Sequence, residues 1–451
     1  MKPEAIIKGK IKAEDSKNES ARDLLAKLKQ EKERLIKEKL ILNSKGISFK
    51  DTDQPPFEIP KNWIWVMLNE VSIIQEGPGI RKHQYKKEGI QFLTVTNILE
   101  GSVDLEKSKK YVTVKEFNDK YKHYKINKKD IVTACSGASW GKSAIYDHDD
   151  TLILNTSTLR LRFFGDFGDN TYLYYLTKAD FFKKQIEEQL SGQQPNFGYA
   201  HYSKIKIPLP HLKEQKRIVS IIDIAFASIT KAKANALQNL KNAKALFESY
   251  LQGVFENKGD NWEEKTLGDI GKPSMCKRIL KHQTSSTGDI PFYKIGTFGK
   301  TPDAFISKEI YNEFRTKYSF PKKGDILISA SGTIGRRVRY DGEPAFFQDS
   351  NIVWIDNDEK QVLNDYLYVF YEFCDWQPSK GATISRLYNS NLTSIKIVFP
   401  KSLGEQKKLI NEMNILSTET KKLEVIYQQK IKDLEELKKS ILQKAFAGEL
   451  K

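Results

Sequence analysis

Apolar residues recur at seven-residue intervals in two long stretches of the chain. No proline occurs from Glu214 to Phe255, and the only glycine in this stretch, Gly253, is near its end. One apolar row consists of Ile222, Ile229, Ala236, Ala243 and Tyr250. Because such a repeat is typical of helices that pair along one face, we predict a long coiled-coil helix here. The alternative is an amphipathic helix on a globular core.

A second stretch with the same spacing lies near the end of the sequence. One row contains Met413, Thr420, Tyr427, Leu434 and Ile441, and the adjacent row contains Leu416, Leu423, Lys430 and Leu437. A contact of limited extent between two helices tolerates polar members such as Thr420 and Lys430. The two stretches therefore predict two long helices that pair with each other.

The remaining segments show shorter periods. Apolar runs predict buried strands at 131–134, 326–328, 151–154 and 351–355. Aromatic residues at helix-like spacing predict helical segments near 171–190 and 362–376. These alternations of strand and helix predict mixed α/β domains beside the long helices.

Residues 18–42 form a highly charged segment with a thin stripe of leucines. Asn18 or Ser20 is placed to cap a helix there. Two arrangements are open for this helix: it is solvated, or it docks onto the long helices.

The chain contains an internal duplication. Residues 62–68 resemble 261–267, and residues 129–137 resemble 324–332. Further on, residues 203–208 and 212–216 match the segments that begin at Ser394 and Leu403, with offsets that shrink slowly from 199 to about 190. Collinear matches at this distance indicate a tandem repeat of two large units, not a solenoid.

The repeat sets the predicted domain limits. Residues 1–56 contain the charged helix and a linker, and 57–210 form the first mixed domain, followed by the first long helix in 211–260. Residues 261–400 form the second mixed domain, and 401–451 form the second long helix. The fold class is therefore mixed α/β, with two repeated domains separated by long helices.

Composition narrows the class of partner. The chain has 451 residues and a formal net charge of +16, and each of the five segments has more Lys and Arg than Asp and Glu. An even positive charge favours a long polyanion such as double-stranded DNA. The sequence shows no signal peptide and no membrane span, and three distant cysteines suit the cytoplasm.

Motifs that suggest catalysis are incomplete. The segment Gly137–Ser143 has three residues between Gly and Gly-Lys, where a phosphate-binding loop needs four. The segment Gln54–Phe57 resembles the Pro-Pro-aromatic signature of adenine methyltransferases, but Gln54 replaces the required Asp, Asn or Ser. The six histidines have no metal-ligand spacing. We therefore expect a protein without catalytic residues, bound metal or bound cofactor.

The repeated motifs, in this order, resemble those of the specificity subunits of type I restriction–modification systems. The segments that carry the resemblance are 24–39, 60–68, 205–216, 261–267, 325–335, 405–407 and 438–450. The resemblance implies two target-recognition domains that each read one half of a bipartite, asymmetric DNA site. It also implies that the two long helices pair as an antiparallel coiled coil.

The resemblance assigns the chemistry to partners. Two methyltransferase subunits and, in the full complex, restriction subunits bind the specificity subunit. S-adenosylmethionine, ATP and Mg²⁺ are then expected only in those partner subunits. The alternative is a recognition subunit of an adenine methyltransferase complex that has no restriction partner. A self-contained restriction–methylation enzyme would need motifs missing here, and a coiled-coil scaffold has no use for two large unequal domains.

Polar and basic loops are the candidates for contact with DNA, because Arg and Lys match guanine and Asn and Gln match adenine. In the first domain the candidates are Arg81, Lys82, Gln84, Tyr85, Ser136, Ser139, Lys142, Gln193, Gln194 and Asn196. In the second domain they are Lys277, Arg278, Lys281, Thr333, Arg336, Arg337, Arg339, Ser385 and Arg386. We expect that Arg336 or Arg337 reads a base, and that some of the other residues contact only phosphate.

Overall fold

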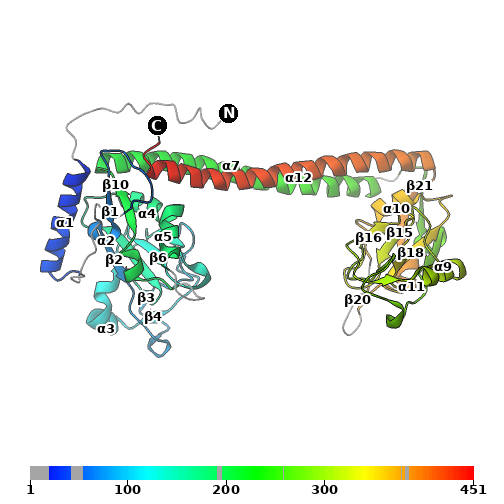
Figure 1. Ribbon diagram of the computed structural model, residues 1–451, viewed down its shortest axis with the longest axis horizontal. Coiled ribbons are helices and arrows are strands. Elements are labelled where there is room, and N and C mark those ends of the chain that lie inside the picture. Colours follow the sequence, from blue (N-terminus) through cyan, green and yellow to red (C-terminus); the bar gives the residue numbers. More distant parts are fainter. Residues whose placement is uncertain are drawn as a thin grey trace. The chain divides into compact units, whose positions relative to one another are not determined.

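The computed structural model describes residues 20–41, 54–189, 196–256, 259–376, 378–380 and 385–450 (Figure 1). The chain divides into two compact units. Unit 1 contains the chain up to Ala236 together with Gln429–Lys451, and unit 2 is Leu237–Gln428. Each unit therefore holds one mixed domain and a part of both long helices. Among the described residues, no helix has the length and apolarity needed to cross a membrane.

Unit 1 begins with the helix α1 (Ala21–Lys37). The strands of its domain are β1 (Ile64–Met67), β2 (Ser72–Glu76), β3 (Ile90–Phe92), β4 (Tyr111–Val112), β5 (Lys125–Ile126), β6 (Ile131–Ala134), β7 (Ser143–Ile145), β8 (Leu152–Ile153), β9 (Thr158–Phe163) and β10 (Lys206–Leu209). Its helices are α2 (Leu68–Val71), α3 (Val114–Glu116), α4 (Asn170–Lys178), α5 (Asp180–Glu187) and α6 (Tyr199–Tyr202). Short helical turns are η2 (Lys82–Gln84), η3 (Phe117–Tyr121), η4 (Lys122–Tyr124) and η5 (Gly137–Ser139).

The domain in unit 2 repeats this order with fewer helices. Its strands are β11 (Trp262–Thr266), β12 (Gly271–Ser274), β13 (Ile290–Tyr293), β14 (Phe305–Ile306), β15 (Ile326–Ser329), β16 (Arg337–Arg339), β17 (Phe346–Phe347), β18 (Ile352–Asn357), β19 (Ser379–Lys380), β20 (Ser385–Arg386) and β21 (Lys396–Pro400). Its helices are α8 (Leu267–Ile270), η6 (Lys281–Gln283), α9 (Lys308–Lys317), α10 (Asn364–Phe370) and α11 (Asn389–Ser394).

The sheets confirm the duplication strand by strand. The order β2-β9-β6-β7 in the first domain corresponds to β12-β18-β15-β16 in the second. The ladder β4-β3-β8 corresponds to β14-β13-β17, and the pair β1-β10 corresponds to β11-β21. The four strand positions predicted from apolar runs are all strands, so these runs indicated the buried sheet correctly.

The long helices are α7 (Leu212–Glu256) and α12 (Leu403–Phe446), close to the predicted limits. The predicted row on α7 is largely buried, with Ile222 fully buried and Ala236 2% exposed. On α12 the polar member Thr420 is 3% exposed, and its hydroxyl donates to the carbonyl of Leu416 at 2.9 Å. Leu423, which we placed in the adjacent apolar row, is 36% exposed. The second apolar row of α12 is therefore not continuous.

Contacts inside unit 1 show that the two helices run antiparallel there, and they also touch in unit 2. In unit 1 the ammonium of Lys233 on α7 lies 2.6 Å from a carboxylate oxygen of Glu435 on α12. In unit 2 the hydroxyl of Tyr250 donates to Glu412 at 3.1 Å. Also in unit 1, the Lys438 ammonium of α12 lies 5.4 Å from the centre of the Phe226 ring of α7. Later positions on α7 therefore meet earlier positions on α12 within unit 1. This confirms the paired arrangement expected from the resemblance.

A buried glutamine fastens each long helix to its domain. Gln215 of α7 is fully buried, and its side chain accepts from the Asp169 amide and donates to the Pro210 carbonyl, both at 2.9 Å. Gln406 of α12 is buried in the same way and binds the Leu363 amide at 2.9 Å and the Pro400 carbonyl at 2.8 Å. These bonds satisfy backbone groups that burial would otherwise leave without partners. They explain why the Glu-Gln-Lys triplet recurs in the sequence.

The charged helix α1 docks onto the first domain. Ser20 caps it, and Leu24 and Leu28 are buried in the core of unit 1. The ammonium of Lys29 lies 3.0 Å from the buried carboxylate of Glu70 on α2. Of the two arrangements that the sequence left open for this helix, the solvated one is wrong. The helix docks, and its polar contacts are with α2 of the first domain. The sequence did not indicate α2 as the covered surface, because this contact joins segments that share no periodic pattern.

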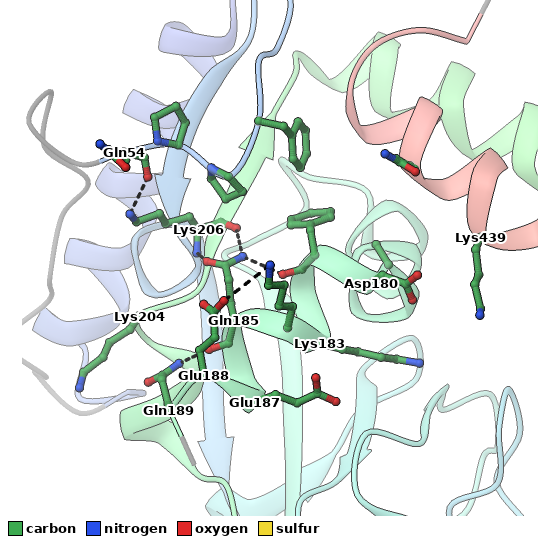
Figure 2. Close-up of a pocket in the computed structure, with 17 residues that line it drawn as sticks. Gln54, Asp180, Lys183, Gln185, Glu187, Glu188, Gln189, Lys204, Lys206 and Lys439 are labelled. Atoms are coloured by element: carbon green, nitrogen blue, oxygen red, sulfur yellow. Dashed lines mark hydrogen bonds and ion pairs between the residues drawn. The ribbon is translucent and has the colours of Figure 1, made fainter. Parts of the chain in front are cut away.

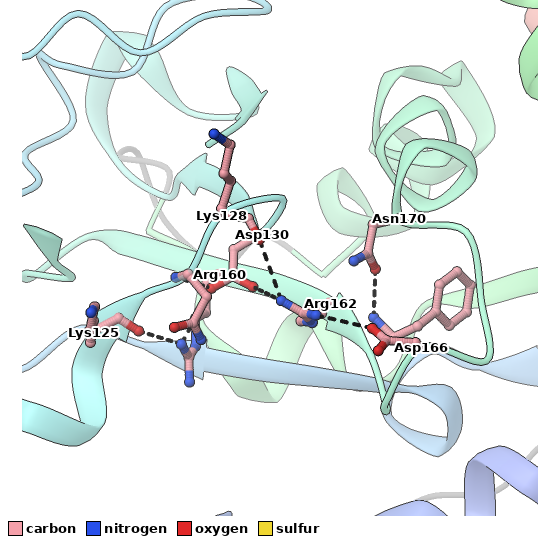
Figure 3. Close-up of polar contacts among 9 residues, drawn as sticks. Lys125, Lys128, Asp130, Arg160, Arg162, Asp166 and Asn170 are labelled. Carbon is pink, nitrogen blue, oxygen red and sulfur yellow. Dashed lines mark hydrogen bonds and ion pairs between the residues drawn. The ribbon is translucent and has the colours of Figure 1, made fainter. Parts of the chain in front are cut away.

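Directly before β6 of the first domain, the buried carboxylate of Asp130 pairs with two arginines (Figure 3). Asp130 is fully buried, and its oxygens lie 3.3 Å from Arg160 and 3.4 Å from Arg162, both on β9. It also accepts from the Asn127 amide at 2.8 Å. Burial raises the pKa of Asp130, and the Arg160 guanidinium opposes that shift. The equivalent Asp325 accepts from the Lys322 amide at 2.7 Å, so the same backbone turn precedes both central strands.

Candidate DNA interface

Both central strands end in a tight turn, which we call the post-strand turn. It comprises Ser136–Lys142 after β6 and Ser331–Arg336 after β15. Gly137 and Gly332 occupy its equivalent positions with φ values of 63° and 67°, a region that favours glycine. The repeat places 129–137 and 324–332 at equivalent positions, and this shared backbone confirms that equivalence. Arg337 and Arg339, which we placed in a loop, lie on β16.

A second predicted loop closes onto the post-strand turn in each domain. In the first domain Ser136 forms a β-bridge with Asn196, and in the second Ser331 forms one with Arg386. Beside these bridges the Phe197 amide donates to the Cys135 carbonyl at 2.9 Å. The corresponding bond in the second domain, from Leu387 to Ala330, measures 2.8 Å. Two loops that lie about 60 residues apart in the sequence therefore form one surface in each domain.

A third segment, the anchor turn, joins the surface in the second domain. It is Asp349–Asn351, directly before β18. The Asn351 side chain accepts from the Ser331 hydroxyl at 2.8 Å, and its carbonyl accepts from the Ala330 amide at 2.7 Å. Asp349 binds Arg278 at 2.8 Å. The anchor turn therefore connects the post-strand turn to the loop before η6.

The first domain has an equivalent anchor turn at Asn155–Ser157. The Ser157 carbonyl accepts from the Cys135 amide at 2.8 Å, as Asn351 does in the second domain. The Thr156 hydroxyl donates to the Pro78 carbonyl at 3.2 Å. Both domains thus bring the same three loops together at the end of the same sheet.

Several predicted residues of the first domain lie on this surface or near it. Arg81, Lys82 and Asn196 are exposed, and Ser139 and Lys142 are half-buried in the post-strand turn. Gln193 and Gln194 lie outside the residues that the structure describes.

Two other predicted residues have internal partners. The Gln84 side chain accepts from the Arg81 amide at 2.9 Å and donates to the Tyr121 hydroxyl at 2.9 Å. The Tyr85 ring packs against Phe92, with 5.1 Å between ring centroids. Both side chains shape the loop around η2, and their contact with DNA stays a prediction.

The arginines of the second domain differ in their surroundings. Arg337 is paired with Glu372 at 2.7 Å and stacks over the Tyr368 ring at 4.5 Å. Arg339 is paired with Asp365 at 2.6 Å. These two arginines bind the sheet to α10 and its C-terminal end, and only 18% of the Arg337 side chain is exposed.

Other candidates of the second domain have fewer such contacts. The Arg336 guanidinium donates to the Phe298 carbonyl at 3.1 Å. The Lys277 ammonium lies 4.6 Å from the centre of the Tyr318 ring. Lys281, Thr333 and Ser385 are exposed. That Arg336 or Arg337 reads a base stays a prediction, and the geometry favours Arg336, because Arg337 is held by Glu372 and Tyr368.

Sequence reasoning missed two features of this surface. The tripeptide Lys-His-Gln occurs at 82–84 and again at 281–283, and it forms the short helix η2 or η6 in each domain. Both glutamines accept from the backbone amide three residues earlier. The offset of 199 matches that of the repeat and was the available signal. The anchor turns gave no such signal, because their residues bind partners far away in the sequence.

A pocket of the first domain lies away from this surface (Figure 2). It measures about 910 Å³ and lies between the Gln54–Phe57 segment, α5 and the end of α12. Lys206 donates to the Gln54 carbonyl at 2.8 Å, and Phe57 packs on Trp65 and Phe181 with 5.0 Å between ring centroids in each pair. Lysines line the pocket, and no histidine, cysteine or serine is among its described lining residues. The Pro-Pro-aromatic segment thus packs against the first domain through Phe57.

Fold and surface together define a duplicated α/β protein whose two domains carry equivalent loop surfaces. Residues 60–239 and 259–436 match the family described as "Type I restriction modification DNA specificity domain". Since these ranges cover most of the chain, it belongs to this family. The chain is a type I restriction–modification specificity subunit with two target-recognition domains, as the repeated motifs predicted.

Individual relatives agree with this assignment. A putative type I restriction enzyme specificity subunit of Haemophilus influenzae is 47% identical over 257 residues, which cover 56% of this chain and 65% of that protein. The match thus spans just under two thirds of that relative. The StySPI specificity subunit of Salmonella potsdam is 23% identical over 87% of this chain and 90% of its own length.

A solved structure shows the same fold. It comes from work on complex assembly and conformational transition of the type I R-M system. The alignment has a TM-score of 0.70 and 20% identity, and it covers 87% of this chain and all of that one. At this identity the likeness concerns the fold alone.

Proposed function

We propose that this chain is the non-catalytic subunit that selects a bipartite, asymmetric DNA site for a type I restriction–modification complex. The observation that carries the proposal is the duplicated loop surface with different residues at equivalent positions. Asn196 bridges the post-strand turn in the first domain, and Arg386 bridges it in the second. Asn suits adenine and Arg suits guanine, so one backbone arrangement is equipped for two different half-sites.

The long helices supply the spacing between the half-sites in this proposal. A helix of 45 residues such as α7 is roughly 68 Å long at about 1.5 Å per residue, which corresponds to about 20 base pairs at about 3.4 Å each. Two repeated units on antiparallel helices meet DNA in opposite orientations, as dimeric readers do. The helix pair then acts as a ruler, and the domains choose the bases.

The partners follow from the same role. Two methyltransferase subunits bind the chain, and restriction subunits join them in the full complex, in the cytoplasm. S-adenosylmethionine, ATP and Mg²⁺ are bound by those partners. The exposed faces of the long helices and of α1 are candidate surfaces for the methyltransferase subunits. A methyltransferase complex without a restriction partner is the alternative, and assembly with and without a restriction subunit separates the two.

Methylation mapping tests the proposal. The chain is co-expressed with its methyltransferase subunit in a host that lacks other adenine methylation, and methylated adenines are mapped across the genome. We expect one motif with two different half-sites and a fixed spacer. Inserting residues into the connector of either long helix should lengthen the spacer and leave both half-sites unchanged. Absence of a bipartite motif, or altered half-sites with an intact spacer, contradicts the proposal.

A further inference from the structure

In the second domain, two consecutive residues of the anchor turn hold two arginines from different loops. The Arg278 Nε donates to the Asp349 carboxylate at 2.8 Å. The Arg386 Nη2 donates to the Ser350 hydroxyl at 2.7 Å and to the Ser350 carbonyl at 3.0 Å. Because Asp349 and Ser350 are adjacent, the two guanidinium groups are anchored one residue apart.

Arg278 keeps donors for a ligand. The Arg278 side chain is 68% exposed, whereas Asp349 is only 17% exposed. A guanidinium has five N–H donors in a planar fork, and the bond to Asp349 uses the one on Nε. The two terminal nitrogens of Arg278 therefore remain for a second, bidentate partner. Because the bond to Asp349 holds one edge of the guanidinium, it fixes the direction of the remaining fork.

Hydrogen bonds within the anchor turn and to the central sheet fix its conformation. Ser350 has a φ of 53°, a left-handed conformation that costs energy for a residue with a side chain. The Asn351 amide donates to the Asp349 carbonyl at 2.6 Å, and Ala330 at the end of β15 donates to Asn351 at 2.7 Å. The turn is thus fastened to the central sheet, and so are the arginines that it carries.

The first domain has the same backbone without this arginine pair. Counted from the shared offsets, Gly79 takes the place of Arg278, Asn155 that of Asp349 and Asn196 that of Arg386. The anchored pair is therefore specific to the second domain. A feature that differs between two copies of one surface is suited to reading different bases, whereas features present in both copies suit contacts that both half-sites share.

We propose that Arg278 reads guanine in the half-site contacted by the second domain, and that Asp349 is a positioning residue for Arg278. Guanine presents two acceptors, O6 and N7, to the major groove, and an arginine fork matches both. The proposal rests on the function proposed above. A phosphate contact uses the same donors without a preference for sequence, and it is the outcome that the test must separate.

Methylation mapping of the assembled complex provides the readout. For Arg278→Gln we expect discrimination for guanine at one position of one half-site to fall on the order of 10-fold to 100-fold. The other half-site and the spacer should stay unchanged, which shows that the variant is folded. Asp349→Asn should relax the Arg278 position with a smaller factor.

Two further variants separate charge from geometry. Arg278→Lys keeps the charge and loses the planar fork, so it should relax the same position as Arg278→Gln. Lys308→Gln removes one exposed charge from the same domain and should leave the motif unchanged. Uniform weakening of all sites by Arg278→Gln, or full discrimination with Arg278→Lys, overturns the proposal.

The two proposals fail in different ways. A wild-type complex that methylates a bipartite motif with no guanine, on either strand, in the half-site contacted by the second domain refutes the role of Arg278 and leaves the proposed function intact. A wild-type complex without any bipartite motif refutes the proposed function.

Discussion

Phe446, at the end of α12, packs edge-on against Tyr172 of α4 in the first domain, with 5.5 Å between ring centroids. Phe446 is fully buried, and so is Tyr172. In unit 2 Phe255 of α7 packs against Tyr366 at 6.1 Å in the same manner. The end of a long helix therefore packs against the core of each domain. In the first domain this helix is α12, the last one in the sequence.

Replacement of Phe446 should destabilise the part of the first domain that contains α4 and α5. Truncating a buried aromatic ring to alanine typically costs about 3–5 kcal/mol, because the cavity left behind does not fill. We expect Phe446→Ala to accelerate hydrogen exchange in α4 and α5, measured by mass spectrometry. Leu423→Ala on the same helix removes an exposed side chain and is the control. Equal effects of both variants would refute the closing role of Phe446.

The buried glutamines make a second prediction. Gln406→Leu removes the amide that binds the backbone of Gln361, Leu363 and Pro400. Each buried backbone group left without a partner costs about 1–3 kcal/mol, so we expect unit 2 to lose about 3 kcal/mol or more. Chemical denaturation measures the loss. The exposed neighbour Lys407, changed to alanine, should cost little, and a similar loss for both variants would count against this explanation.

Lys82 and Lys281 hold equivalent exposed positions in the repeated Lys-His-Gln tripeptide. Residues shared by both domains suit phosphate, which every half-site offers. We expect Lys82→Gln and Lys281→Gln each to weaken binding to all sequences and to lower the slope of log K against log salt by about 0.9. Fluorescence anisotropy at several KCl concentrations measures both effects. A changed target motif would contradict this assignment, and Lys37→Gln on α1 is the matched control.

The ion pair between Lys233 and Glu435 should make unit 1 weakly sensitive to acid. The hydrogen bond from Lys233 lowers the pKa of Glu435 below its ordinary value of 4.5. The stabilisation is then present above that value and disappears as the pH falls through the lowered pKa. Because both side chains are more than a third exposed, the pair contributes only about 0.2–1 kcal/mol.

Urea unfolding of wild type and Glu435→Gln at pH 7 and at about pH 3.5 tests this. The difference between the two proteins should shrink at the lower pH and at high salt. Glu436→Gln, whose partner Lys439 lies on the same helix, controls for the loss of one carboxylate. A difference that does not change with pH would show that the pair adds no stability.

The long helices were predictable within two residues at each end of α7. The prediction ran from Glu214 to Phe255, and the helix spans Leu212–Glu256. A seven-residue apolar period and the absence of proline act through neighbouring residues, so a local pattern suffices. The exposure of Leu423 was not predictable, because it depends on how far the partner helix extends along that face.

The candidate surface was predictable only in part. The repeat placed the post-strand turns at equivalent positions, and the bridges Ser136–Asn196 and Ser331–Arg386 bring the predicted loops together. The sequence did not separate Arg278, whose side chain is 68% exposed, from Arg337, which is bound to Glu372. Their partners lie 71 and 35 residues away, and no local pattern connects such positions.

By itself, the sequence determined the duplication, the two long helices, the mixed α/β domains and the family. These properties follow from apolar periods and repeated motifs that can be recognised in the sequence alone. The tertiary structure alone decided that α12 closes the first domain, that α1 covers α2, and that the anchor turn holds Arg278 and Arg386. The physical reason is that these contacts join residues far apart in the chain, and each partner is chosen by packing and hydrogen bonding after the chain has folded.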